Sequence, residues 1–135
     1  MNSIYREEIL EHYRDPQNFG KLKNFDISSK QLNPFCGDEI EIFIRFENKS
    51  WGVNNEPPQG CTISEVSFMG KGCAICIAAC SILTEFVKGK TEKQLTKFSE
   101  KDMLDLLGIE LSETRKKCGF LALCTLKDCL KNGKI

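Results

Sequence analysis

Three cysteines stand in sequence settings that favour a reactive thiolate. Cys36 lies in the stretch NPFCGD, Cys73 follows the stretch GKG, and Cys118 follows the basic run RKK. Thiolate is the form of cysteine that ligates metals and attacks sulfur, and it is favoured by nearby cations, by a helix N-terminus or by a metal. We therefore expect the three thiols to share one metal or sulfur site.

A carboxylate stands beside the first of these thiols. Asp38 is two positions after Cys36, and Gly37 between them can adopt backbone angles that let both side chains point to one side. Taken alone, this motif is more typical of a turn in which Asp38 accepts backbone hydrogen bonds. The two further cysteines favour a ligand role instead. One tetrahedral Zn²⁺ site, or two irons bridged by sulfide, would fit the ligand set Cys36, Asp38, Cys73 and Cys118.

The other thiols have a simpler interpretation. Cys76 forms a C-x-x-C pair with Cys73, a spacing common to zinc and thiol redox sites, but a redox pair of this kind normally follows a βαβ pattern that is missing here. We therefore expect core packing for Cys76, with contact to the metal site as the less common alternative. We also expect small core residues at the remaining positions, Cys61, Cys80, Cys124 and Cys129. Disulfides are the minor alternative for all eight cysteines in a reducing compartment.

One histidine limits the possible enzyme chemistry. A cysteine hydrolase needs a base beside its thiol, and His12 is the single imidazole in the sequence. It lies on an apolar helix face, where packing or an interface is a more common role than that of ligand or base.

Composition restricts the partners and the compartment. The chain has 135 residues, which predicts one domain over 1–135, and 19 basic residues balance 19 acidic ones. Because the net charge is zero, no long-range electrostatic attraction would draw the chain to nucleic acid or to an acidic membrane. Its start is too charged for a signal peptide and no apolar run is long enough to cross a membrane, so we expect a cytoplasmic protein. The sequence leaves the oligomeric state open.

The predicted elements place helices at both ends and strands between them. Alternating apolar residues indicate a strand over 40–46, a second over 61–69 and a weaker one over 25–32, with a breaker-rich loop over 48–60. The second strand changes phase, which predicts a bulge or bend between Ile63 and Val66. Helical spacing and end signals predict helices over 4–13, 74–87, 91–97 and 99–107 and from Ser112 onward. This order predicts an α+β fold, with a small three-stranded antiparallel sheet and helices packed on one face.

Several motifs together resemble one known family. YREEILEHYRDPQNFG, NPFCGD, GKGCAI, TEFVKGK and KKCGFLALCTLKDCL occur in the order found in the IscU/SufU/NifU-N-terminal type of iron–sulfur cluster assembly scaffold. The resemblance spans nearly the whole chain. It implies a scaffold that receives sulfur from a cysteine desulfurase, takes up iron, assembles a [2Fe–2S] cluster and passes it to acceptor proteins. The family's ligands map onto Cys36, Asp38, Cys73 and Cys118.

The chain departs from both branches of that family. IscU members carry histidine directly before the third cysteine, where this chain has Lys117. SufU members also lack that histidine and bind zinc, but they have an insertion between the second and third cysteines that is missing here. The chaperone-recognition stretch of IscU is replaced by LSETR. The resemblance therefore leaves two roles open: a scaffold that is not an enzyme, or a zinc-dependent sulfurtransferase in which Cys36 accepts persulfide.

Overall fold

The computed structural model describes residues 3–33, 37–47 and 62–132. The sheet contains three antiparallel strands in the order β1 (Ile27–Asn33), β2 (Asp38–Phe46) and β3 (Ile63–Lys71). The helices are α1 (Ser3–Arg14), α2 (Ala74–Val87), α3 (Glu92–Thr96), α4 (Glu100–Leu107) and α5 (Glu113–Asn132). The predicted α+β class and three-stranded antiparallel sheet are confirmed. The predicted loop over 48–60 lies outside the described residues.

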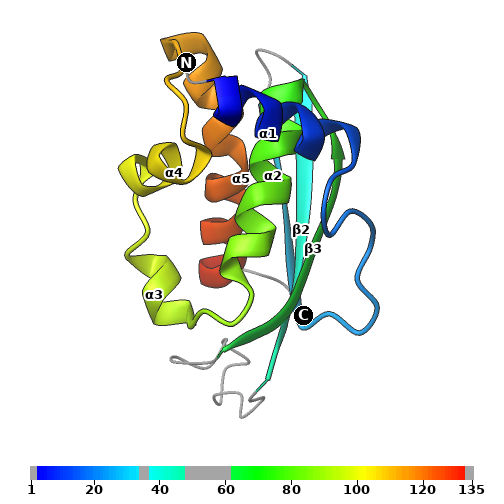
Figure 1. The fold of residues 1–135 in the computed structure, drawn as a ribbon. Coiled ribbons are helices and arrows are strands. Elements are labelled where there is room, and N and C mark those ends of the chain that lie inside the picture. Colours follow the sequence, from blue (N-terminus) through cyan, green and yellow to red (C-terminus); the bar gives the residue numbers. More distant parts are fainter. Residues whose placement is uncertain (1–2, 34–36, 48–61, 133–135) are drawn as a thin grey trace.

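The central strand shows why the sheet has one core face. Ile40, Ile42 and Ile44 alternate along β2 and are fully buried. Successive side chains on a strand point to opposite faces, so these three lie on the same face. Figure 1 shows α2 and α5 side by side over that sheet, where α5 contacts β1 and β2 while α2 contacts β3. The core therefore lies between the sheet and these two helices.

The predicted bulge in the third strand is present. Arg45 pairs with Glu65, but the next residue of β2, Phe46, pairs with Ile63, so Ser64 is the extra residue on β3. An extra residue reverses the alternation of side chains beyond it. Ile63 and Val66 are consequently both buried.

The helix ends follow the predicted local signals. Thr91 and Ser99 are N-caps, and each forms a capping box with a side chain three residues later. Gly89 and Gly108 adopt positive φ angles of 80° and 71° after α2 and α4, the backbone conformation in which glycine commonly ends a helix. None of the helices in the described ranges is long and apolar enough to cross a membrane.

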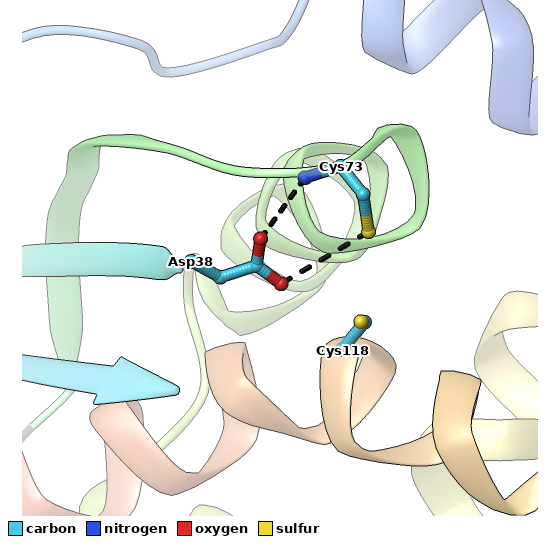
Figure 2. Close-up of side chains that lie close together, drawn as sticks. All are labelled: Asp38, Cys73 and Cys118. Atoms are coloured by element: carbon cyan, nitrogen blue, oxygen red, sulfur yellow. Dashed lines mark hydrogen bonds between the residues drawn. The ribbon is translucent and has the colours of Figure 1, made fainter. Parts of the chain in front are cut away.

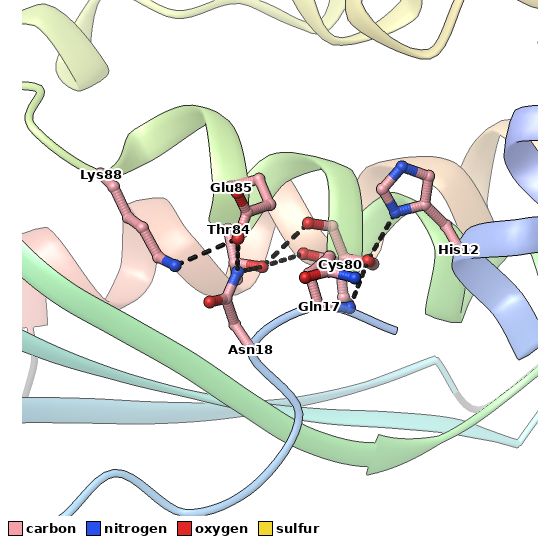
Figure 3. Close-up of polar contacts among 8 residues, drawn as sticks. His12, Gln17, Asn18, Cys80, Thr84, Glu85 and Lys88 are labelled. Atoms are coloured by element: carbon pink, nitrogen blue, oxygen red, sulfur yellow. Dashed lines mark hydrogen bonds and ion pairs between the residues drawn. The ribbon is translucent and has the colours of Figure 1, made fainter. Parts of the chain in front are cut away.

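Polar side chains attach α1 and the turn after it to α2 (Figure 3). Ser81 is fully buried on α2, where its Oγ accepts a hydrogen bond from the Gln17 backbone N–H at 2.8 Å and lies 2.7 Å from His12 Nδ1. Asn18 Nδ2 donates to Thr84 Oγ1 and to Glu85 Oε1. Hydrogen bonds from Lys88 and Asn18 lower the pKa of Glu85. His12 thus has the packing role expected for it.

Candidate metal centre

The hairpin between β1 and β2 places Asp38. Asn33 pairs with Asp38 in the register of the two strands, and the Gly37 N–H donates to the Asn33 carbonyl at 2.9 Å. Gly37 has a φ of 73°, a conformation that few other residues adopt readily. Asp38 thereby begins β2 with its side chain buried, at 1% exposure. Cys36 belongs to the same connection but lies outside the described residues.

Cys73 meets this carboxylate at the start of α2. It is the N-cap residue, and its backbone N–H donates to Asp38 Oδ1 at 3.1 Å while its Sγ lies 4.0 Å from Oδ2 (Figure 2). The first N–H groups of a helix have no partner within the helix and carry partial positive charge. Here the Cys73 N–H meets the Asp38 carboxylate, and carboxylates and thiols both bind metals as anions.

Cys118 completes the group from α5. It is almost fully buried on the apolar stripe of that helix, as its spacing predicted, and its Sγ faces Asp38 and Cys73 in Figure 2. A carboxylate oxygen of Asp38 and the two sulfur atoms all lie within 4.8 Å of one another. The structure therefore brings together three of the four side chains expected to ligate a metal, from three elements far apart in the sequence.

Gly72 is a part of the site that we did not anticipate from the sequence. A Cβ atom there would lie 2.8 Å from Asp38 Oδ1 and 3.1 Å from Cys76 Sγ, closer than such atoms normally approach. A glycine directly before the cysteine was the available signal, but it was equally consistent with a simple break between strand and helix. Its lack of a side chain leaves space for the carboxylate.

The other described cysteines differ in their surroundings. Cys76 and Cys80 are fully buried on α2, and a hydrogen bond with Cys80 together with burial raises the pKa of Cys76. Burial also raises the pKa of Cys129, which packs in the core as predicted. The core prediction was wrong for Cys124, which is exposed, because it lies off the apolar stripe of α5. The six described cysteines are all free thiols, and Cys61 lies outside the described residues.

The donor set fits a thiophilic metal. Two sulfur atoms and one carboxylate oxygen, with one further ligand, match a tetrahedral zinc site, and thiolates are also the usual ligands of iron–sulfur clusters. Lys117, which precedes Cys118 on α5, is exposed. The arrangement can therefore hold a soft metal ion or a small cluster near the surface.

Comparison with known proteins places this chain in one family. The family model for the NifU-like N terminal domain matches residues 4–134. The chain is 30% identical over 137 residues to the iron-sulfur cluster assembly scaffold protein IscU 1 of Archaeoglobus fulgidus, a match covering 98% of this chain and 81% of that protein.

Two further similar proteins carry names of the SufU branch. The zinc-dependent sulfurtransferase SufU of Bacillus subtilis is 32% identical over 90 residues, which cover 67% of this chain and 52% of that protein. A crystal structure of a putative iron-sulfur cluster assembly scaffold protein for the SUF system from Fervidobacterium islandicum superimposes with a TM-score of 0.75 at 26% identity, covering 96% of this chain and 98% of that one. The chain belongs to the IscU/SufU/NifU-N-terminal family.

Proposed function

We propose that this protein is an iron–sulfur cluster assembly scaffold. In this role it receives sulfur from a cysteine desulfurase, binds iron, assembles a [2Fe–2S] cluster and transfers the cluster to acceptor proteins. The observation that carries the proposal is the convergence of Asp38, Cys73 and Cys118 within 4.8 Å in a chain similar to named scaffolds. A cytoplasmic location fits this role, because a reducing compartment keeps the thiols free.

Each residue of the centre would have a role that follows from its chemistry as a ligand. Cys73 and Cys118 would hold iron as thiolates, and Cys36 would supply the third thiolate from the hairpin. Asp38 is a harder ligand than a thiolate and binds soft metals less strongly. A carboxylate among three sulfur ligands would therefore keep the cluster labile enough to leave for an acceptor.

A second role uses the same ligands differently. In a zinc-dependent sulfurtransferase, Cys36, Asp38, Cys73 and Cys118 would hold Zn²⁺, and Cys36 would leave the metal to accept persulfide from the desulfurase. Lys117 favours this alternative, since it stands where IscU members have histidine and cannot ligate as an imidazole does. The similarity to a named zinc-dependent sulfurtransferase supports it as well.

Reconstitution separates the two roles. Metal-free protein is mixed anaerobically with a cysteine desulfurase, cysteine and ferrous iron, and visible absorption and Mössbauer spectra are followed, with the zinc content measured as purified. The scaffold role predicts a coloured cluster that moves to an acceptor apo-protein. Tight zinc, faster cysteine turnover and no cluster would instead establish the transferase.

Asp38→Ala tests the carboxylate in either role. We expect slower release of the cluster to an acceptor or weaker zinc binding, because the alanine removes both the hard ligand and the partner of the Cys73 N–H. The measurements are the rate of cluster transfer and zinc affinity by chelator competition. Asp105→Ala, at a carboxylate on α4, is the control. If Asp38→Ala behaves like this control, Asp38 is not a ligand.

A further inference from the structure

Two thiols at the start of α2 occupy the positions whose side chains meet in a capping box. Cys73 is the N-cap, and Cys76 is the third residue of the helix. In a capping box the side chains at these two positions reach across the first turn, each toward the backbone N–H of the other residue. The C-x-x-C pair therefore stands where two side chains of a helix start can touch.

Two other helices of this chain show how close such side chains come. In the capping box of α3, Thr91 Oγ1 lies 3.3 Å from Gln94 Oε1, and in that of α4, Ser99 Oγ lies 3.0 Å from Asp102 Oδ2. The backbone of Cys73 is extended like that of these N-caps, with φ −71° and ψ 169° against −89° and 156° at Thr91. The same backbone can therefore direct the Cys73 side chain toward Cys76.

The geometry of the helix also suits a bond between the two sulfur atoms. The Ile77 N–H donates to the Cys73 carbonyl at 3.1 Å, so Cys73 already belongs to the first helical turn. Cα atoms three residues apart in a helix are separated by about 5 Å, and disulfides join Cα atoms about 4.4–6.8 Å apart. Each side chain turns about a single χ1 angle. The first turn of α2 thus brings two thiols within bonding reach without a βαβ fold.

The two thiols differ in their access to solvent. Cys73 is half-buried, whereas Cys76 is fully buried. Cys76 Sγ lies 3.1 Å from the position that a Cβ atom on Gly72 would occupy, so it faces back toward the start of the helix. This order suits a reaction in two steps, in which the accessible thiol reacts first and the buried thiol second.

We propose that Cys73 and Cys76 are a redox-active dithiol that closes to a disulfide by exchange with a low-molecular-weight disulfide. The Cys73 thiolate attacks one sulfur of that disulfide, which forms a mixed disulfide and releases the first small thiolate. Cys76 then loses its proton and attacks the Cys73 sulfur, and the second small thiolate leaves. The two released thiolates take up the two protons that the cysteines lose. Two cysteines are oxidised, one small disulfide is reduced to two thiols, and a dithiol reductant reverses the reaction.

Closing this disulfide would remove Cys73 from the proposed metal centre. This consequence rests on the proposed ligand set, whereas the exchange itself needs only the two thiols. A sulfur atom in a disulfide is no longer a thiolate, which is the form that ligates metals. Oxidation of the pair and metal binding by Cys73 therefore exclude each other.

Peptide mapping of the metal-free protein tests the exchange. Reduced protein is incubated anaerobically with oxidised glutathione, quenched with acid, alkylated and cleaved after lysine and arginine. Peptide 72–88 then carries Cys73, Cys76 and Cys80, and peptide 118–127 carries Cys118. We expect peptide 72–88 to lack two hydrogens and to be alkylated at Cys80. Glutathione retained on Cys73, or a disulfide that joins this peptide to another cysteine peptide, would overturn the inference.

Cys76→Ser should stop the reaction after its first step. The mixed disulfide of Cys73 with glutathione should be at least about tenfold more abundant than in wild type, where a positioned intramolecular thiol displaces the glutathione. Cys80→Ser is the matched control, since it changes an equally buried thiol on the same helix and should form the wild-type disulfide. Loss of the disulfide in Cys80→Ser would assign it to Cys80 and contradict the proposal. Circular dichroism checks that both variants fold, and the wild-type map decides without them.

Zinc separates this inference from the proposed metal centre. Zinc at 100 times its dissociation constant leaves about 1% of the protein metal-free, so it should slow the closing of the disulfide about 100-fold if Cys73 is a ligand. A disulfide that forms at the same rate with and without zinc would support the dithiol and contradict the ligand role of Cys73. A metal-free protein that forms no such disulfide, yet binds zinc, would overturn the dithiol and leave the centre intact.

Discussion

At the residue scale, the site depends on how closely Asp38 approaches the first turn of α2. The carboxylate is buried and accepts the Cys73 N–H, and that approach uses the space beside Gly72. Gly72 does not have the positive φ that favours glycine at Gly37. Glycine is therefore needed at position 72 because a side chain would crowd the Asp38 carboxylate, and not because the backbone there requires a glycine.

Gly72→Ala tests this space requirement. The new Cβ would lie 2.8 Å from Asp38 Oδ1 and 3.0 Å from its Cγ, so the carboxylate must shift away from the Cys73 N–H. We expect weaker zinc binding and a loss of about 1–3 kcal/mol in unfolding free energy, as for other overpacked sites. Chelator competition and denaturant unfolding measure the two effects. Lys71→Ala, at the exposed neighbouring residue, should change neither; equal effects would contradict the steric explanation.

At the element scale, α2 connects the site to the N-terminal helix. Its first residues face Asp38, whereas Ser81, Thr84 and Glu85, farther along, bind the turn that follows α1. The helix is apolar over most of its surface because it is enclosed by α1, α5 and the sheet. Its position depends on packing from several sides together with these polar contacts at its edge.

Replacing Ser81 and Ser67 by alanine, one at a time, tests whether the hydrogen bonds of Ser81 stabilise the fold or whether any buried serine has the same effect. Ser81→Ala leaves the Gln17 N–H and His12 Nδ1 without their shared partner, and the loss of a typical hydrogen bond costs about 0.5–1.5 kcal/mol. Ser67 is also buried, but its Oγ has no hydrogen-bond partner among the described residues. Ser67→Ala should therefore be close to neutral in denaturant unfolding. Similar losses for both variants would show that the contacts to Ser81 contribute little.

At the scale of the whole molecule, the site joins segments that are distant in the sequence. Asp38 comes from β2, Cys73 from the start of α2 and Cys118 from α5. A metal that binds these residues together binds the folded chain and not the unfolded one. Metal binding is then coupled to folding, and it adds stability according to its concentration relative to its dissociation constant.

Zinc removal should lower the melting temperature for this reason. A free zinc concentration 100 times the dissociation constant adds about 2.7 kcal/mol, which chelation would remove. Cys118→Ala should lose most of the zinc-dependent rise in Tm, measured by circular dichroism with and without zinc. Cys124→Ala, at an exposed cysteine on the same helix, should retain it. A rise that survives in Cys118→Ala would mean that zinc binds elsewhere.

The sequence alone was sufficient for features that are local. Alternating isoleucines predicted β2, the change of phase predicted the bulge at Ser64, and Thr91 and Ser99 predicted two helix starts. Each of these depends on a repeat of side chains along one segment or on a cap beside it. The family motifs likewise identified the candidate ligands by position.

Distances between segments were decided only by the tertiary structure. Spacing could not reveal that Asp38, Cys73 and Cys118 come within 4.8 Å, or that Gly72 leaves space for the carboxylate. These facts depend on how α2 and α5 pack against the sheet and which face each helix presents. A periodic pattern specifies that a face is buried, but the neighbours of that face are set by the packing of the whole chain.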